Sequence, residues 1–166
     1  MDYLDTFSSF AAQTRFAALP PEVREQVGWI RADTVAAIAA GSAEPELRAW
    51  AGLQPHSAAA TLIGLGRSGS TDAAALINGS AGTFLEMDEG NRFARGHPAI
   101  HVLPAVLALC QERQAGAEVF LSAFVTGYEV GSRLGAASRL RASMHPHGTW
   151  GTVGAAAAWC ATSMPA

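Results

Sequence analysis

The sequence contains no lysine, so all eleven of its basic residues are arginine. A reaction that needs a lysine amine therefore cannot run on this chain unaided. Charged residues make up only 15% of the chain, the formal net charge is -3, and no basic tract is present. The lack of a basic surface signal sets nucleic acid aside as a partner. The low charge also predicts that part of the surface contacts another copy or a complementary chain.

Signals for export and for membrane insertion are also lacking. The N-terminus is acidic, and no window approaches the roughly 18 uninterrupted apolar residues of a membrane span. The two cysteines, Cys110 and Cys160, are far apart in apolar stretches, a pattern typical of buried thiols in a reducing compartment. We therefore expect a cytoplasmic protein with no membrane contact.

Hydrophobic residues make up 49% of the 166 residues, enough to bury the core of one domain. Alternating runs of strand type are nearly absent, whereas alanine-rich stretches are divided by Gly and Pro. This pattern predicts an all-α, bundle-like fold with no internal domain boundary. Local signals predict a first helix that ends before Pro20, and further helices over Pro21–Gly41, 45–53, 70 or 71 to about 87, and 117–137. Another helix is expected to begin at Pro98, with a kink or delay at Pro104. A last helix follows the glycine-rich segment 148–154.

Residues able to carry chemistry are concentrated in two segments. In the first, Glu86, Asp88 and Glu89 are expected at a helix C-terminus, where the helix dipole would raise carboxylate pKa values. His97 follows at the expected start of the next helix. The second segment has His145 and His147 before another helix. Two helix N-termini beside Arg and His would suit a substrate with several carboxylates, and the acids and imidazoles could move protons next to a carboxylate.

Plainer interpretations of these residues remain open at this stage. The three carboxylates could form a solvated helix end paired with Arg92 and Arg95. His97 and His145 could be helix caps, and His101 and His147 are expected to be structural or exposed. A metal site is disfavoured, because the helical zinc motif needs Glu where this sequence has Pro98. Nucleophile and phosphate-loop motifs are not found.

Short motifs lie along the second half of the chain and the segment before it. They are residues 74–81 (AALINGSA), 86–89 (EMDE), 96–98 (GHP), 102–105 (VLPA), 127–130 (GYEV), 133–135 (RLG), 145–146 (HP) and 151–157 (GTVGAAA). In order and spacing they resemble the N-terminal third of the MmgE/PrpD family. The similarity covers about residues 58–158, and the joint pattern is specific although each piece is weak.

The resemblance implies a large helical domain paired with an α/β lid, and proton transfer next to a carboxylate without metal or organic cofactor. Family members include 2-methylcitrate dehydratase, cis-aconitate decarboxylase and iminodisuccinate epimerase. By resemblance, the catalytic residues are His97, His145, Asp88 and Glu86. The expected contacts to a small polycarboxylate substrate are Gly90, Arg95 and Thr149.

The sequence departs from the family at several points. Gly90 stands where many relatives have threonine and Glu86 where they have aspartate, which leaves dehydration, decarboxylation and epimerisation open. The resemblance places the lid and the catalytic lysines in a part of the family fold beyond this chain. We therefore expect residues 1–166 to be a partial helical domain that is inactive alone. The alternative is an inactive helical module or pseudoenzyme that acts through oligomerisation.

Overall fold

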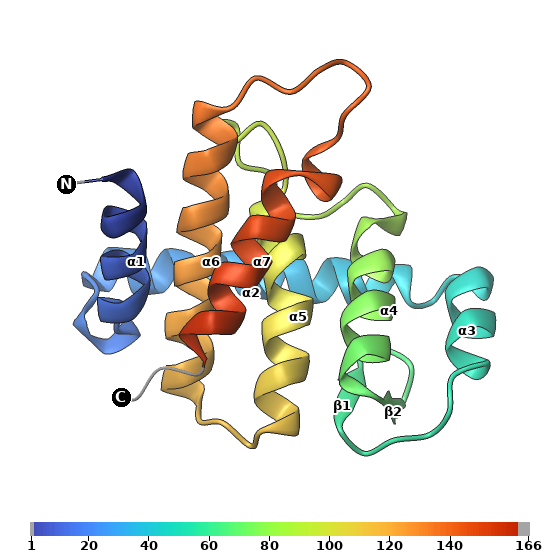
Figure 1. The fold of residues 1–166 in the computed structure, drawn as a ribbon. Coiled ribbons are helices and arrows are strands. Elements are labelled where there is room, and N and C mark those ends of the chain that lie inside the picture. The colour runs from blue at the N-terminus through green and yellow to red at the C-terminus, as the bar shows by residue number, and fades with distance from the viewer. Residues whose placement is uncertain (1, 163–166) are drawn as a thin grey trace.

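A computed structural model describes residues 2–162 and confirms a mostly helical fold (Figure 1). Four helices, α4 to α7, stand side by side, and α2 lies across them. The elements are α1 (Tyr3–Gln13), a 3₁₀ turn η1 (Phe16–Ala18), α2 (Pro21–Gly41), α3 (Pro45–Gly52), β1 (Ala60–Leu62), β2 (Arg67–Gly69), α4 (Thr71–Phe84), α5 (Pro98–Glu112), α6 (Ala117–Ala137), a 3₁₀ turn η2 (Pro146–Gly148) and α7 (Trp150–Ala161).

Helix α6 has the predicted bounds and contributes a buried stripe to the main core. Phe124 at its centre is 1% exposed and packs with Leu103 of α5 and Ile38 of α2. This stripe follows from apolar residues spaced at three and four positions along the helix. The prediction of a central buried helix is confirmed.

Helices α6 and α7 approach closely because glycines face one another across their contact. A Cβ atom at Gly127 would lie 2.6 Å from the Gly154 carbonyl oxygen, and one at Gly154 would lie 2.8 Å from the Gly127 oxygen. Real Cβ atoms are not found at such distances from a carbonyl oxygen, so both positions require glycine. Packing against α6 therefore explains the glycine at position 154.

Three local expectations are corrected by the structure. Helix α4 ends at Phe84 rather than near residue 87, since Glu86 adopts a left-handed backbone with φ of 53°. Pro104 lies inside α5 and does not delay its start at Pro98. Cys160 is exposed, whereas Cys110 is buried as expected.

A short antiparallel hairpin was not predicted. Strands β1 and β2 pair from Ala60 with Gly69 to Leu62 with Arg67. The Asn78 side-chain amide of α4 donates to the Thr61 carbonyl at 2.9 Å and accepts from the Ile63 N–H at 2.9 Å. The free edge of β1 is thus bonded to a helix, which replaces the missing neighbouring strand.

Candidate active site at the loop end of the helices

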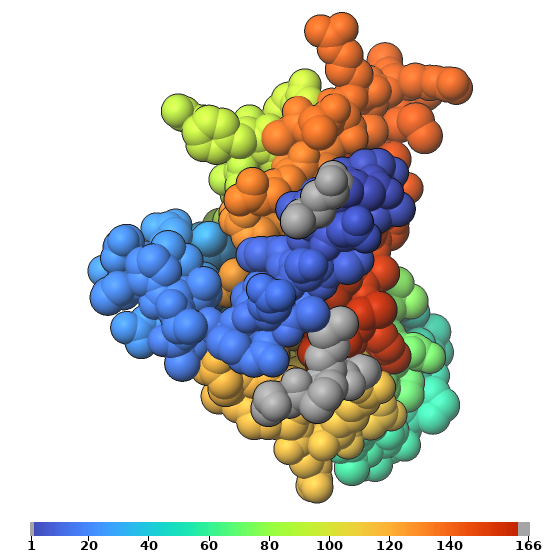
Figure 2. All heavy atoms as spheres, turned by 60° about the vertical axis from the view of Figure 1, so that its left-hand side comes forward, coloured from blue at the N-terminus to red at the C-terminus, as the bar shows by residue number. Residues whose placement is uncertain are grey.

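Two loops meet at one end of the upright helices because these helices alternate in direction. The loop of residues 85–97 joins α4 to α5, and the loop of residues 138–149 joins α6 to α7 (Figure 1). Both loops project from the same end of the molecule in the space-filling view (Figure 2). Residues separated by some 50 positions in sequence are therefore brought together.

The acidic segment lies in the first loop and not at a helix end. The expected rise in carboxylate pKa is found for Asp88 and Glu89, but its main cause is burial and not the C-terminal dipole of α4, which ends at Phe84. The Glu89 carboxylate instead accepts a hydrogen bond of 3.2 Å from the Ala99 N–H in the first turn of α5. Glu89 is thus placed at the positive end of a helix, where negative charge is favoured.

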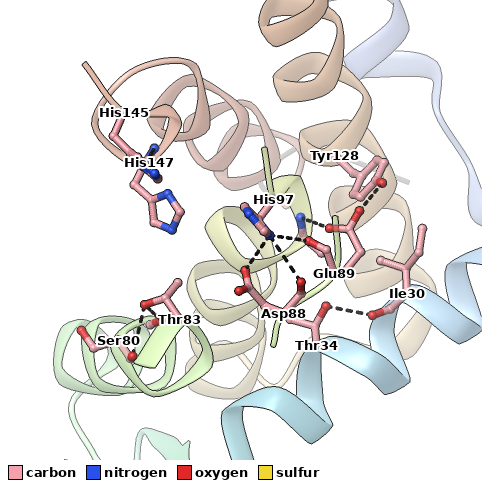
Figure 3. Close-up of polar contacts among 12 residues, drawn as sticks. Ile30, Thr34, Ser80, Thr83, Asp88, Glu89, His97, Tyr128, His145 and His147 are labelled. Carbon is pink, nitrogen blue, oxygen red and sulfur yellow. Dashed lines mark hydrogen bonds and ion pairs between the residues drawn. The ribbon is translucent and has the colours of Figure 1, made fainter. Parts of the chain in front are cut away.

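The imidazole of His97 is held from one side by the acidic loop (Figure 3). Its Nδ1 lies 2.9 Å from the Glu89 carbonyl oxygen and 3.3 Å from the Asp88 carbonyl oxygen. A carbonyl oxygen only accepts hydrogen bonds, so Nδ1 carries the proton. In neutral His97 the Nε2 atom is therefore an unprotonated base.

A carboxylate lies against the protonated side of the same ring. Asp88 Oδ2 is 3.4 Å from His97 Nδ1, and the Asp88 side chain is 3% exposed. Burial raises the pKa of Asp88, and the nearby His97 opposes this rise. Among the described residues Oδ2 has no hydrogen-bond partner. Its principal favourable contact is thus the His97 ring, which it would stabilise most when that ring is charged.

A second set of contacts fixes the loop that holds His97. The Tyr128 hydroxyl of α6 donates to Glu89 Oε1 at 2.7 Å and accepts from the Asn91 amide at 3.2 Å. Burial raises the pKa of Glu89, while the hydrogen bonds from Tyr128 and Ala99 lower it. Burial and the bond to Glu89 raise the pKa of Tyr128. Helix α6 thereby anchors the backbone carbonyl to which His97 donates.

Four imidazoles form a contiguous cluster with His147 at its centre. The His147 ring centroid lies 4.4 Å from that of His145, 4.5 Å from that of His101 and 6.2 Å from that of His97. Burial and the neighbouring His147 lower the pKa of His101 to about 4. Burial and His145 also lower the pKa of His147, although Asp88 opposes that change. The fold therefore favours the neutral form of His101 and His147.

The second loop is folded so that its histidines reach this cluster. Thr149 Oγ1 donates to the His145 carbonyl at 3.0 Å, and the His145 ring Nδ1 accepts from the His147 N–H at 3.3 Å. Gly151 leaves room for the ring from α5, because a Cβ atom there would lie 2.4 Å from His101 Nδ1. Both the turn and the glycine thus position imidazoles.

A cleft of about 320 Å³ opens beside the cluster, between α4 and α5. His101, His147, Ser80 and Thr83 supply its polar lining, and Ile100 supplies part of its apolar wall. A separate groove of about 300 Å³ between α2 and α6 is more apolar than this cleft. We place the candidate site beside the first cleft, since two of its lining residues, His101 and His147, belong to the imidazole cluster.

The structure brings together His97, Asp88 and, through His147, His145. Glu86 is exposed on the same loop, close enough to affect the pKa values of Asp88 and His147. Thr149 lies beneath His145. The other two expected contacts are placed elsewhere: Gly90 lines a neighbouring hollow with Glu89 and Tyr128, and the Arg95 guanidinium donates to carbonyls at the end of α6, including the Gly135 oxygen at 3.1 Å.

The plainer interpretations are resolved in part by these contacts. Neither Arg92 nor Arg95 forms an ion pair with the loop carboxylates within residues 2–162. His97 stands at the N-cap position of α5 but makes no side-chain capping bond, whereas His145 does cap η2. Among the described residues, no group of three His, Cys, Asp or Glu side chains is arranged to hold a metal ion.

Sequence reasoning noted His101 and His147 but expected them to be structural or exposed, and it gave Tyr128 no role in the site. A signal for His101 was present, because it lies four residues after His97 and therefore on the same face of α5. His147 offered a weaker signal, its separation of two residues from His145. Nothing local distinguishes Tyr128 from a core aromatic residue of α6.

The fold and this loop site together define a helical domain with an imidazole and carboxylate centre. The N-terminal domain model of the MmgE/PrpD family matches residues 5–163, and the chain belongs to that family. No curated protein matches the chain. Between residues 2 and 162, no helix has the length and apolar character needed to cross a membrane.

Proposed function

We propose that this chain supplies the proton-transfer centre of a cofactor-independent lyase or epimerase that acts on a small polycarboxylate. The observation that carries the proposal is the orientation of His97, whose Nδ1 proton is bound by loop carbonyls and whose Nε2 is left as a base. A base so oriented can remove a proton from carbon next to a carboxylate. Asp88 would then stabilise the imidazolium that forms.

The imidazole cluster supports the choice of an anionic substrate. His101 and His147 pack against one another, and burial favours their neutral form. The chain has no lysine to supply fixed positive charge, so a positive charge at this site would come from protonation of a histidine ring. Carboxylates of a substrate would be counter-ions for protonated rings. In full-length family members, by resemblance, a lid and lysines complete the site, so substrate binding is a more direct test for this chain than turnover. We also propose a cytoplasmic location, on the basis of the two free cysteines.

The test uses tricarballylate, an unreactive tricarboxylate, titrated into the chain by isothermal calorimetry. His97→Gln should weaken binding by roughly ten-fold, since the imidazole that can donate to a ligand carboxylate is lost. Asp88→Asn should also weaken binding, because protonated His97 loses its counter-ion. His56→Gln, at an exposed position outside the cluster, is the matched control and should bind as the wild type does. Unchanged affinity in both site variants would overturn the proposal.

A second candidate function is an inactive helical module that acts through association. It is favoured by the apolar groove between α2 and α6, which is lined by Val23, Val27, Ile30, Phe124 and Val125 among others. Absence of tricarballylate binding, combined with a stable dimer, would favour this candidate.

A further inference from the structure

The cleft between α4 and α5 has features that the His97 and Asp88 pair does not require. His101 and His147 line it on one side and Ser80 and Thr83 on the other. Figure 3 shows His147 reaching from the second loop toward Thr83 and Ser80 of α4, with His97 beside it. The cleft therefore adjoins the proposed base through His147, whose ring centroid is 6.2 Å from that of His97, but has polar groups of its own.

Two ring nitrogens in this region have no partner. Within the described chain, His101 Nε2 and His147 Nδ1 are buried atoms without a hydrogen bond. An unpaired buried polar atom costs free energy. Both atoms have almost no exposed surface, so a ligand in the cleft recovers this free energy only when a ring turns toward it. The rings are already in edge contact, with centroids 4.5 Å apart. One ligand group could thus be near both.

We propose that this cleft is a carboxylate subsite in which the His101 and His147 pair takes up one proton from solvent as a substrate carboxylate enters. This inference rests on the proposed function, because it places a further carboxylate of the same substrate. The new N–H bond lets the ring donate to the carboxylate, and the Ser80 hydroxyl of α4 is a further donor in the lining. The Thr83 hydroxyl already donates to the Gly79 and Ser80 carbonyls.

The proton uptake follows from the charges that face the pair. His97 and His145 disfavour a further positive charge, while Asp88 and Glu86 favour it for His147. An entering carboxylate adds negative charge next to the rings and raises the pKa of the pair above its value in the free protein. At a pH between the pKa of the pair in the free protein and its pKa in the complex, binding of the ligand is accompanied by uptake of a proton. Affinity for the ligand should therefore rise as pH falls from about 7 to about 5.

The experiment is tricarballylate binding by calorimetry in two buffers that differ in ionisation enthalpy and carry neither carboxylate nor phosphate. The wild type should bind with uptake of about one proton near pH 6. His147→Asn should bind about ten-fold more weakly and lose most of the proton uptake. His56→Gln should retain both.

A second variant guards against a simple folding defect. Gly151→Ala keeps both histidines but displaces the His101 ring, because the added Cβ would lie 2.4 Å from its Nδ1. It should therefore also lose proton uptake, while circular dichroism reports a helical fold like that of the wild type.

The outcomes separate this inference from the proposed function. One outcome would overturn the subsite and leave the proposed function standing. In it, His147→Asn and Gly151→Ala bind with the affinity and proton uptake of the wild type, whereas His97→Gln binds more weakly. A wild type that does not bind tricarballylate would overturn both.

Discussion

At the scale of single residues, Tyr128 is the point where α6 is joined to the acidic loop. Its hydroxyl donates to Glu89 at 2.7 Å, and the Glu89 backbone in turn holds His97. Tyr128→Phe should lower the free energy of unfolding by about 1–2 kcal/mol, since a part-buried acceptor loses its donor. Chemical denaturation measures the change. Tyr3→Phe, at an exposed position, is the control, and equal effects of the two substitutions would contradict this role.

His101 should make stability depend on pH. Burial and the neighbouring His147 lower its pKa from 6.5 to about 4 in the folded chain. Between these values the unfolded chain binds more protons, so the contribution of His101 to stability is present above pH 6.5 and is lost as pH falls to about 4. After allowance for solvent, the loss should be roughly 2 kcal/mol.

The measurement compares the slopes of unfolding free energy against pH for the wild type and His101→Gln. Asp88 and Glu89 act in the opposite sense, because their raised pKa values favour the folded chain as pH falls. Their contribution is common to both proteins, so the difference in slope isolates His101. Parallel curves for the two proteins would show that His101 is not held neutral by the fold.

At the scale of elements, the glycine contact between α6 and α7 is the most demanding in the fold. Gly127→Ala would place a Cβ atom 2.6 Å from the Gly154 carbonyl oxygen. The two helices must then separate, and we expect a loss of about 1–3 kcal/mol in unfolding free energy. At Gly28 on α2 an added Cβ atom would have no other atom within 4 Å. Gly28→Ala should therefore be neutral or raise the free energy of unfolding by about 0.5–1 kcal/mol. Thermal unfolding that ranks these variants in the reverse order would disprove the packing explanation.

The helices were predictable where the signals are local. Pro21 begins α2 and Gly41 ends it, and the apolar spacing of residues 117–137 gave α6 its bounds. The hairpin was missed because each strand has three residues and the edge of β1 is bonded to Asn78, a contact made across the fold. Such contacts leave no periodic pattern in the sequence.

The site was predictable to the extent that the family resemblance supplied it. His97 and Asp88 were expected and lie together. The central place of His147 could not be foreseen, since it depends on how the loop of residues 138–149 folds back over α5. The expected contact of Arg95 with substrate stays a prediction, and its guanidinium donates to carbonyl groups at the end of α6. Loop geometry of this kind is decided by tertiary contacts.

At the scale of the whole molecule, we expect the chain to associate with itself and to show no turnover of cis-aconitate, 2-methylcitrate or iminodisuccinate. Large apolar side chains are exposed on several elements, including Trp29 at 66% and Phe93 at 72%. Their burial in another copy is favoured by about 25 cal/mol per Å². The chain also lacks lysine, and an open site weakens each charge interaction. Light scattering and steady-state assays test both expectations. A monomer that turns over one of these substrates, and loses this activity in His97→Ala, would contradict them.

The central claim is that His97 is a base with its proton on Nδ1 and an unprotonated Nε2, and nitrogen NMR of the histidine rings tests it most directly. With ¹⁵N-labelled histidine at a pH where His97 is neutral, its Nδ1 should show the shift of a protonated nitrogen and its Nε2 that of an unprotonated one. Addition of tricarballylate should move the His97 and His147 signals and leave His56 unchanged. A His97 ring protonated at Nε2 instead, or ligand-induced shifts at His56 without any at His97, would contradict the account.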